Sequence, residues 1–420
     1  MKREFDGKRA LHHAEAISSP RLVDTPGETD ARQFIRTTLE RLGYSVTVRP
    51  FRFWPHFPMF FVKALVLFCM ALLALLVLAE PAAPAASAAG ALAVGALVVW
   101  GARKYADYAA RIDRDPTSDL PLLRKIFPSV AQRLESANVE AWRTEENRDD
   151  DVDFRLTFMA HYDSKSQNLR LSVRVISVAL MYAAVAGLVI RLGLDLLVPS
   201  LALSGPARAV TWILFAVALA ASAGVVALRT ANRSPGALDN AGSVGVLLHL
   251  AEVLSENPPL DGLRIRFVFT GAEELGLAGA YFHVRDLPSG GAASSSGLHV
   301  NLDGVGGGGR LFATMETGLF SGNAGRFPQA IERVRRAASA AGMEIKTLGH
   351  VVGGAADHFP LAQKKIPAVT LGQYSRKSWR IHTSQDVPEL LDSNELESVG
   401  RLLLELIDAS TADGEGTHSR

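Results

Sequence analysis

The N-terminal part of the chain shows two hydrophobic patterns in succession. Between residues 31 and 42 apolar side chains recur every three or four positions, which predicts one face of a helix, and Gly43 is placed to end that helix. Residues 44–48 then alternate between apolar and polar side chains, as a half-buried strand does. Residues 10–48 therefore indicate the opening of a soluble α/β domain.

Two of the next stretches are apolar over the length that a bilayer requires. Residues 59–79 are long enough to cross the ~30 Å hydrocarbon core, and their only charged residue, Lys63, lies close enough to the start to reach the interface. Residues 85–102 follow after a short turn at 80–84. The two stretches predict a transmembrane hairpin.

A second pair of apolar stretches lies between residues 171 and 228. Residues 175–190 are short for a span, although Arg174 and Arg191 at their ends can reach the interfaces, and residues 210–228 have the ordinary length. Buried helices of a large core are the alternative interpretation of all four stretches. Because soluble core helices are rarely free of charge over about 20 residues, the pattern favours a second transmembrane hairpin.

From residue 229 onward, strand-like and helical patterns alternate. Together with an earlier strand-like run, they predict an α/β fold with a mixed, largely parallel central sheet flanked by helices. The polar residues 411–420 are expected to be a disordered tail. The strand-like runs lie at 154–160, 264–269, 298–302 and 366–372, and the helical patterns at 240–254, 327–341 and 393–408.

These patterns divide the chain into soluble and membrane segments. Three soluble segments together supply the strands of one sheet, and the two hairpins interrupt them. The expected soluble segments are 1–57, 103–170 and 229–410, the hairpins are 58–102 and 171–228, and the tail is 411–420.

The composition agrees with a large domain that has an apolar surplus. Of the 420 residues, 48% are hydrophobic and 21% are charged, and the surplus falls in the four apolar stretches. The net charge of +1, without a basic run interleaved with aromatic residues, gives no indication of nucleic acid as a partner. Cys69 is the only cysteine, which excludes an internal disulfide framework and a thiolate metal cluster. The basic N-terminus lacks an apolar core, so we expect no cleavable signal peptide.

Candidate chemistry is centred on Asp239. Pro235 and Gly236 break the preceding segment, and a helical pattern begins just after Asp239, with Asn240 as the expected N-cap. Asp239 is therefore expected at the mouth of a helix. Acidic residues and histidines gather in the same way in four further motifs, AHYDS at 160–164, FTGAEELGLAGA at 269–280, VNLDG at 300–304 and RIHTSQD at 380–386.

Several of these side chains suit a pair of zinc ions. Zinc accepts imidazole nitrogen and carboxylate oxygen, and two ions about 3.5–4 Å apart need a carboxylate between them plus a histidine and a carboxylate on each side. His161 ends a predicted strand, and Asp163 is placed to accept the other ring N–H of His161. Taken singly, His161 is more often a core or surface histidine, and Asp239 only a helix cap.

The adjacent carboxylates Glu273 and Glu274 are more informative, because they repel each other unless a cation or a shared proton compensates. One can bind metal while the other takes a proton from water, although a solvated acidic turn has the same pattern. Asp303 follows a strand and precedes a glycine run, and His382 alone suits a surface position. Because these residues fall mostly at the ends of predicted strands, where open α/β sheets bind ligands, the sequence predicts one dinuclear metal site.

As a set, the motifs resemble those of the co-catalytic dinuclear zinc aminopeptidase family, AHYDS, PGAxDNxxG, EExGLxGA, NLD and HTxxD. The resemblance covers roughly residues 10–57, 137–170 and 230–410, and it implies the phosphorylase/hydrolase-like zinc exopeptidase fold. It also implies that Glu273 is the general base that acts on a metal-bound water. The implied cofactors are two Zn²⁺, with Asp239 as the bridging ligand, His161 and Asp303 completing one ion, Glu274 and His382 completing the other, and Asp163 supporting His161.

The chain departs from the family pattern in three respects. The two predicted hairpins interrupt the domain. Ala356 stands where the family's SDHxxF segment has serine, which leaves Asp357 and His358 as supporting or packing residues. His249 stands where the family often has glutamate, a change that bears on substrate preference and not on the metal ligands.

We therefore expect a membrane-bound zinc metallopeptidase, most specifically an aminopeptidase acting on peptides with a free N-terminus. A glutaminyl cyclase or a small-molecule amide hydrolase would keep the metal site and change the reaction. A non-catalytic membrane receptor or scaffold of the same fold is another alternative, but it would not need the base Glu273. A transporter is disfavoured because the spans carry no charged residues at their centres.

The charges that flank the spans predict the orientation of this multi-pass protein in an inner or plasma membrane. The soluble segments must meet on one side, since they build one sheet. The only basic residues in the opposite loops are Arg191 and Arg208, so the positive-inside rule predicts a cytoplasmic catalytic domain. The expected partner of the hairpins is the lipid bilayer. The basic residues on the side of the soluble segments are Arg49, Arg52, Arg103, Lys104, Arg111, Lys165, Arg170, Arg174, Arg229 and Arg233.

Overall fold

The computed structural model divides the chain into two compact units, each built from segments that are far apart in the sequence. The first unit consists of Met1–Phe53, Arg133–Gln167 and Thr230–Arg420, and the second of Trp54–Gln132 and Asn168–Arg229. The chain thus leaves the first unit twice and returns to it twice. The structure describes residues 3–118, 120–143, 156–198, 200–201, 204–259, 263–287, 297–315, 327–348 and 355–415.

The first unit is organised around an eight-stranded sheet in the order β1-β2-β6-β3-β7-β10-β8-β9. Strands β6, β3, β7 and β10 run parallel at its centre, and antiparallel partners adjoin them on both sides. This mixed, largely parallel sheet confirms the predicted fold class. The strands are β1 (Ser45–Phe53), β2 (Leu134–Trp142), β3 (Leu156–His161), β6 (Ile265–Thr270), β7 (Leu298–Leu302), β8 (Arg310–Thr314), β9 (Lys346–Thr347) and β10 (Ala368–Tyr374).

Side chains of the central strands alternate between two apolar cores, one on each face of the sheet. Phe158 of β3 and Phe267 of β6 pack into the larger core, whereas the next residues, Met159 and Val268, pack into the smaller one. This alternation is the two-residue period of a strand. Because both faces are buried, the central strands have nearly continuous apolar sequences.

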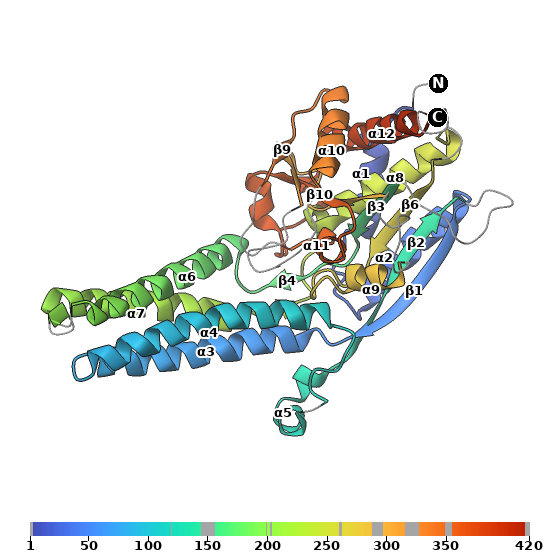
Figure 1. Ribbon diagram of the computed structural model, residues 1–420. Coiled ribbons are helices and arrows are strands. Elements are labelled where there is room, and N and C mark those ends of the chain that lie inside the picture. The colour runs from blue at the N-terminus through green and yellow to red at the C-terminus, as the bar shows by residue number, and fades with distance from the viewer. Residues whose placement is uncertain are drawn as a thin grey trace. The chain divides into compact units, whose positions relative to one another are not determined.

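Helices cover both faces of this sheet (Figure 1). Over the larger core, α1 packs against α8 and α12, and α10 packs against α12, while α9 and α11 contact each other over the smaller core. Helix α2 and strand β1 confirm the helix and strand predicted between residues 31 and 48. The helices are α1 (Gly7–Ile17), α2 (Pro26–Arg41), α8 (Gly242–Glu256), α9 (Ala278–Asp286), α10 (Pro328–Ala340), α11 (His358–Gln363) and α12 (Ser393–Glu415).

Four long apolar helices make up most of the second unit. Helix α3 packs against α4 and α7, and α6 packs against the same two helices. A Cβ atom added at Gly90 or Gly101 of α4 would lie only 2.5 Å from Leu76 or 2.0 Å from Leu65 of α3, so glycine allows the close approach of these helices. The helices are α3 (His56–Ala79), α4 (Pro84–Ala110), α6 (Leu171–Gly193), α7 (Gly205–Val226) and the short α5 (Pro121–Ile126).

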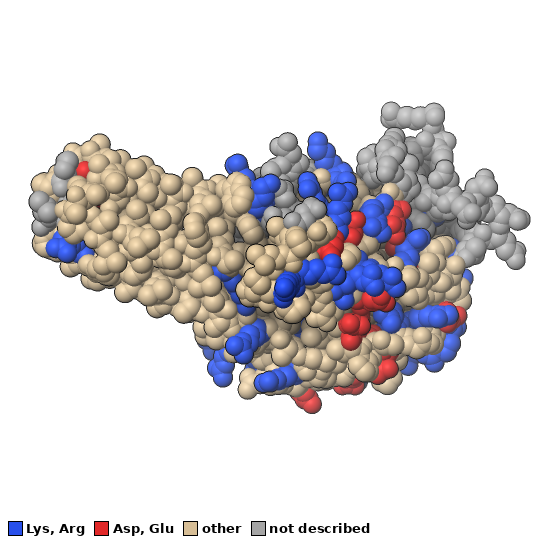
Figure 2. All heavy atoms as spheres, turned by 90° about the horizontal axis from the view of Figure 1, so that it is seen from below, with Lys and Arg blue, Asp and Glu red and all other residues tan. Residues whose placement is uncertain are grey.

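Five helical segments in the described part of the chain are long and apolar enough to cross a membrane, and their burial separates them into two kinds. The segment Ala237–Glu256, which contains α8, is 94% buried, as a core helix is. The four segments of the second unit are only 17% to 28% buried. Figure 2 shows the visible surface of these four helices almost free of charged side chains. The second unit therefore exposes apolar surface that is compatible with two transmembrane hairpins.

A buried ion network joins the loop ends of the two hairpins. The guanidinium of Arg191 is buried, 2.8 Å from Oε1 of Glu80 and 2.8 Å from Oδ1 of Asp195. The hydroxyl of Thr211 on α7 lies 3.5 Å from the same oxygen of Glu80. Since Glu80 lies between α3 and α4 and the other three residues belong to the second hairpin, the network ties the hairpins together.

The unit boundaries differ from the expected ones after the first hairpin. The sequence places residues 103–132 in a soluble segment, but they belong to the second unit. The physical reason is that α4 continues to Ala110, and the ring of Phe127, after α5, packs 5.1 Å from the ring of Phe60 on α3.

The expected disorder of the tail is wrong for residues 411–415, which continue α12, whereas residues 416–420 lie outside the described residues. Residues 154–155, at the start of a predicted strand, also lie outside them.

Candidate metal centre

The predicted site residues come together at the carboxyl ends of the parallel strands, where open α/β sheets bind ligands. Asp239 alone comes from elsewhere, the turn η4 (Ala237–Ala241) that precedes α8. The others are His161 at the end of β3, Glu273 and Glu274 after β6, Asp303 after β7, and His382 after β10 and the short helix η6 (Arg376–Arg380).

Asp239 lies between the two histidines. Its Oδ1 is 3.1 Å from Nε2 of His161, and its Oδ2 is 3.0 Å from Nε2 of His382. Because each carboxylate oxygen faces a different imidazole, Asp239 is placed to contact two cations at once. A bridging carboxylate requires this arrangement.

Three further carboxylates face the same two histidines. Oε2 of Glu274 is 3.0 Å from Nε2 of His382, while Oδ1 of Asp303 and Oε2 of Glu273 are 3.8 Å and 3.9 Å from Nε2 of His161. The ligand atoms form two groups, each within 4.8 Å, that could each hold a metal ion. One group is His161, Glu273 and Asp303, and the other is Asp239, Glu274 and His382.

Asp163 is fully buried and anchors the loop that carries the two glutamates. Its Oδ1 accepts a hydrogen bond from the backbone N–H of Glu273 at 3.0 Å, and its Oδ2 accepts one from Glu274 at 3.2 Å. Nδ1 of His161 lies 3.2 Å from the backbone carbonyl of Asp163 and 3.6 Å from its carboxylate. The expected partner of this ring nitrogen is thus replaced by the nearer carbonyl, because the carboxylate is turned towards the two backbone N–H groups.

Arg21 fixes the turn that carries Asp239, although no motif includes it. The Arg21 side chain donates hydrogen bonds to the carbonyl oxygens of Tyr162 at 2.6 Å and Gly236 at 2.7 Å, and to that of Pro235. Burial lowers the pKa of Arg21 to about 10 despite the nearby carboxylates, so it remains charged at neutral pH. The guanidinium therefore joins the end of β3 to the turn and adds positive charge beneath the site.

Asn240 has a different role from the expected N-cap. Its Nδ2 donates to the carbonyl of Leu302 at 2.9 Å, and its Oδ1 accepts from the N–H of Gly304 at 3.1 Å. The capping prediction is wrong because the side chain turns towards the end of β7 and not towards the backbone of α8. These bonds hold both neighbours of Asp303 beside the Asp239 turn.

Two charged residues, one directly after the motif AHYDS and one inside the motif RIHTSQD, also support the site. Nζ of Lys165 lies 2.8 Å from Oε2 of Glu274 and donates to its carbonyl at 2.9 Å. Asp386 accepts from the backbone N–H groups of Leu238 at 2.8 Å and Asp239 at 3.3 Å, and burial raises its pKa to about 7. Lys165 follows the last letter of one motif and Asp386 is the last letter of another, yet the sequence pattern does not show which groups they contact.

A two-stranded ribbon holds the segment that carries His382. Strand β4 (Ser166–Gln167) pairs antiparallel with β5 (Thr230–Ala231), and the backbone N–H of Gln167 donates to the carbonyl of His382 at 2.9 Å. The chain leaves the first unit after β4 and returns to it at β5. The residues of the first unit that flank the second insertion are thus part of the framework around the site.

Carboxylates and imidazoles shift one another's pKa values strongly. Burial by itself would lower the pKa of His161, but the carboxylates, Glu273 first, raise it well above its ordinary value. Burial alone would raise the pKa of Asp239, yet the two histidines bring it well below its ordinary range. Burial raises the pKa of Glu273 well above its ordinary value, and Glu274 and Asp303 raise it further, although His161 opposes this. These shifts favour the neutral form of Glu273 in the absence of an added positive charge such as a metal ion.

The residues present fit zinc. Nε2 of His161 is buried and makes no hydrogen bond to the described residues, although it faces the oxygens of three carboxylates. A buried imidazole nitrogen in this position suits a metal ligand, because zinc accepts both imidazole nitrogen and carboxylate oxygen. With Asp239 shared, the donor set matches two adjacent ions.

Comparison with known proteins agrees with this geometry. Residues 220–407 match the family described as Peptidase family M28. Over 174 residues the chain is 30% identical to Aminopeptidase YwaD of Bacillus subtilis strain 168, an alignment that covers 40% of this chain and 36% of that protein. The chain thus spans about a third of the length of this curated relative. The predicted resemblance to the dinuclear zinc aminopeptidase family is confirmed.

Solved structures share the fold over almost the whole chain. BSAP, a zinc aminopeptidase from Bacillus subtilis, has a TM-score of 0.53 at 16% identity and covers 97% of this chain and 95% of its own. The aminopeptidase of Aneurinibacillus sp. strain AM-1 has a TM-score of 0.53 at 15% identity and covers 97% and 94%. Glutaminyl cyclase from Porphyromonas gingivalis has a TM-score of 0.52 at 18% identity and covers 96% and 98%. At such identities the likeness establishes the fold, which is that of the zinc exopeptidases.

Proposed function

We propose that the protein is a zinc-dependent metallopeptidase, and more specifically an aminopeptidase that hydrolyses the N-terminal bond of peptides with a free N-terminus. The observation that carries the proposal is Asp239, whose carboxylate oxygens lie 3.1 Å and 3.0 Å from the Nε2 atoms of His161 and His382. The match to Peptidase family M28 and the similarity to Aminopeptidase YwaD support a peptidase.

In this proposal Asp239 would hold both zinc ions, His161 and Asp303 would complete the set for one ion, and Glu274 and His382 would complete it for the other. Zinc, when bound, polarises the carbonyl of the scissile bond and makes water more acidic. The protein's own contribution is to hold the ligands in register.

Glu273 is assigned the proton transfer. Its carboxylate faces the centre, 3.9 Å from Nε2 of His161, and its backbone is anchored on Asp163. Glu273 takes a proton from the attacking water and then gives one to the leaving amine, as a general base and acid does. The carbon–nitrogen bond breaks as the new carbon–oxygen bond is completed, and the products are a free amino acid and a shortened peptide.

A substrate panel tests this function on the full chain purified in detergent. We expect free amino acids to be released from unblocked peptides but not from N-acetylated ones, with activity lost to a chelator and restored by zinc. Peptides that begin with glutamine belong in the panel, because the glutaminyl cyclase from Porphyromonas gingivalis shares the fold. A cyclised product without amino acid release would indicate a cyclase. Zinc binding without turnover of any substrate would favour a receptor or scaffold.

Asp163→Asn is expected to lower turnover or zinc affinity about 10- to 100-fold, the usual cost of losing a group that orients metal ligands. Both carboxylate oxygens of Asp163 now accept a hydrogen bond from a backbone N–H group. In the asparagine variant an NH₂ group would replace one of these oxygens and face a backbone N–H, so one hydrogen bond would be lost and the loop of Glu273 and Glu274 would loosen. Steady-state kinetics and zinc titration measure the effect. Asp30→Asn, an exposed change on α2, is the control, and equal values for the two variants would contradict this role.

We also propose that the second unit inserts into a lipid bilayer as two hairpins. Its four long segments are apolar and mostly unburied within the protein. The first unit is assembled from three segments that the second unit interrupts twice, so the chain must return to the same side after each excursion. Two hairpins satisfy this requirement.

The orientation with a cytoplasmic first unit follows from the positive-inside rule. Of the two arginines in the opposite loops, Arg191 is neutralised by Glu80 and Asp195, which leaves Arg208. Reporter fusions in the loop at residues 80–83 and at the C-terminus test the orientation: we expect an exported signal from the loop and a cytoplasmic one from the C-terminus. The opposite pair of signals would reverse the orientation and keep the hairpins. Signals from the same side at both points would exclude the first hairpin.

A further inference from the structure

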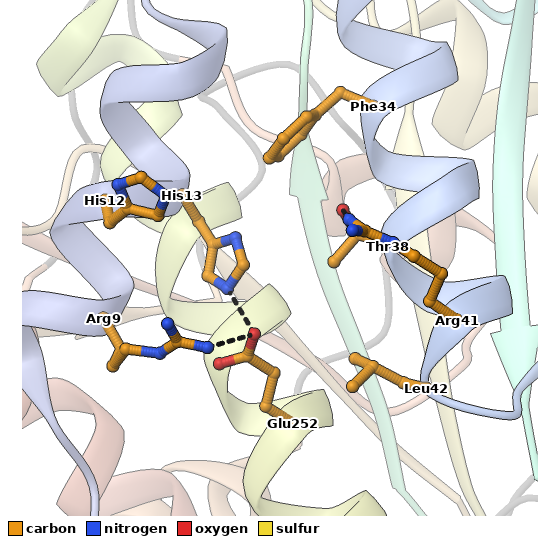
Figure 3. Close-up of a pocket in the computed structure, with 8 residues that line it drawn as sticks. All are labelled: Arg9, His12, His13, Phe34, Thr38, Arg41, Leu42 and Glu252. Carbon is orange, nitrogen blue, oxygen red and sulfur yellow. Dashed lines mark hydrogen bonds and ion pairs between the residues drawn. The ribbon is translucent and has the colours of Figure 1, made fainter.

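A cavity lies in the first unit between α1, α2 and the C-terminal half of α8 (Figure 3). Its volume is about 310 Å³, which is within the range of small-molecule sites. None of the proposed metal ligands lines it. The cavity is therefore distinct from the candidate metal centre.

Glu252 of α8 is already fully engaged at one side of this cavity. Its Oε1 lies 3.2 Å from the guanidinium of Arg9 and 2.9 Å from Nε2 of His13, and its Oε2 lies 2.8 Å from Nδ1 of His249. Nε2 of His249 accepts a hydrogen bond from the backbone N–H of Asp6 at 3.0 Å. Because Nε2 is the acceptor, the ring proton of His249 is on Nδ1. His249 thus holds the start of α1 onto α8.

The same network determines the tautomer of His13. An ionised carboxylate only accepts hydrogen bonds, so Nε2 of His13 carries the proton that it donates to Glu252. Nδ1 is then an acceptor, and among the described residues it has no partner, although the side chain is only 8% exposed. Burial lowers the pKa of His13 even though Glu252 opposes this, which favours the neutral ring.

The unpartnered nitrogen of His13 is directed into the cavity. Figure 3 shows one ring nitrogen on Glu252 and the opposite edge of the ring turned towards Phe34 of α2. The ring centroids of His13 and Phe34 are 6.2 Å apart, at an interplanar angle of 60°. A buried acceptor without a donor costs free energy, so this nitrogen suits a ligand that supplies an N–H or O–H group.

The wall formed by α2 offers a cation and apolar surface. Arg41 donates to the carbonyl of Thr37 at 3.2 Å and to the hydroxyl of Thr38 at 3.3 Å, but it makes no ion pair with any described residue. Its charge is therefore available to an acidic group. Phe34 and Leu42 are half-buried and line the same cavity, to which they present apolar surface.

We propose that this cavity binds a free α-amino acid with an apolar side chain. The ammonium group donates to Nδ1 of His13, the carboxylate accepts from Arg41, and the side chain packs against Phe34 and Leu42. The assignment of the source rests on the proposed function, since such amino acids are the products of an aminopeptidase. The complementarity of the cavity does not depend on that activity.

Isothermal titration of the detergent-purified full chain with L-leucine tests the site. Arg41→Gln should weaken binding at least about ten-fold, because a charge-assisted hydrogen bond is lost. Arg36→Gln is the matched control, an exposed arginine on the same helix that pairs with Glu40 at 2.7 Å, and it should bind leucine as the unmodified protein does. His13→Phe should also weaken binding, and Arg41→Gln, at an exposed position, decides the matter if His13→Phe does not fold.

Two analogues and one further variant complete the experiment. We expect 4-methylpentanoate, which lacks the amino group, and isopentylamine, which lacks the carboxylate, to bind more weakly than leucine. If leucine binds as a product at the metal centre, Asp239→Ala should lose leucine binding and Arg41→Gln should keep it. If leucine binds in the proposed cavity, Asp239→Ala should keep leucine binding and Arg41→Gln should weaken it. That pattern is expected whether or not the protein hydrolyses peptides, so a failure of the proposed activity is distinguishable from a failure of this site.

Equal leucine affinity in Arg41→Gln and Arg36→Gln would overturn the proposal, and so would the absence of binding to the unmodified protein at millimolar leucine. Binding of 4-methylpentanoate as tight as that of leucine would overturn the role of His13 as acceptor.

Discussion

Asp239→Ala is expected to release both zinc ions and to reduce turnover to the background of the assay. Among the carboxylates of the described site, only that of Asp239 faces both histidines, with one oxygen 3.1 Å from His161 and the other 3.0 Å from His382. Without Asp239, each ion keeps one histidine and one carboxylate of the proposed set. Because loss of a merely orienting group costs about 10- to 100-fold, loss of a shared ligand should lower zinc affinity by more than about 100-fold.

Zinc content measured by mass spectrometry after gel filtration gives the result directly. Glu274→Ala should resemble Asp239→Ala, since Glu274 also faces His382 at 3.0 Å. Asp30→Ala on the exposed side of α2 is the control for handling, and circular dichroism checks that the overall helix content is unchanged. An Asp239→Ala protein that retains two zinc ions per chain would show that Asp239 does not bridge them.

The fold class and the clustering of the candidate site residues could be predicted because both depend on short-range patterns. The central strands are buried on both faces, so their sequences are continuous apolar runs that stand out from their surroundings. His161 ends one such run and Asp303 directly follows another. Since parallel strands present their carboxyl ends at one edge of the sheet, residues at those ends must lie near one another.

Interactions between distant segments could not be predicted in the same way. Arg21 lies in an N-terminal loop with no periodic signal, and its role arises only because the fold brings the end of β3 beside the turn before α8. Asn240 has the sequence context of a helix cap, but its side chain finds both a donor and an acceptor at the end of β7. In each case the choice among partners is made by tertiary structure, whereas the sequence shows only that a polar group is present.

Charges near apolar helices show the same limit. Arg191 stands at the end of an apolar stretch, where an arginine usually reaches an interface. In the structure it contacts Glu80, which is 111 residues away in the sequence. Together with Asp195, Glu80 compensates the charge of this buried guanidinium. This pairing depends on the tertiary structure, which brings the two loops together.

Glu273→Gln is expected to keep both zinc ions and to lower turnover by about 10² to 10⁴ fold, the usual contribution of a general base. Glutamine has nearly the same size, and the backbone N–H of residue 273 would still donate to Asp163, so the loop should stay in place. The amide, however, cannot accept a proton from water. The pH dependence of turnover and the zinc content of the purified variant are the two measurements.

This substitution also decides an assignment that distances alone leave open. Oε2 of Glu273 and Oδ1 of Asp303 lie 3.9 Å and 3.8 Å from Nε2 of His161, so either carboxylate is close enough to share a cation with that histidine. If Asp303 is the ligand and Glu273 the base, Asp303→Asn loses zinc while Glu273→Gln loses only turnover. Loss of zinc in Glu273→Gln with retention in Asp303→Asn would exchange the two roles, and unchanged turnover in Glu273→Gln would remove Glu273 from the mechanism.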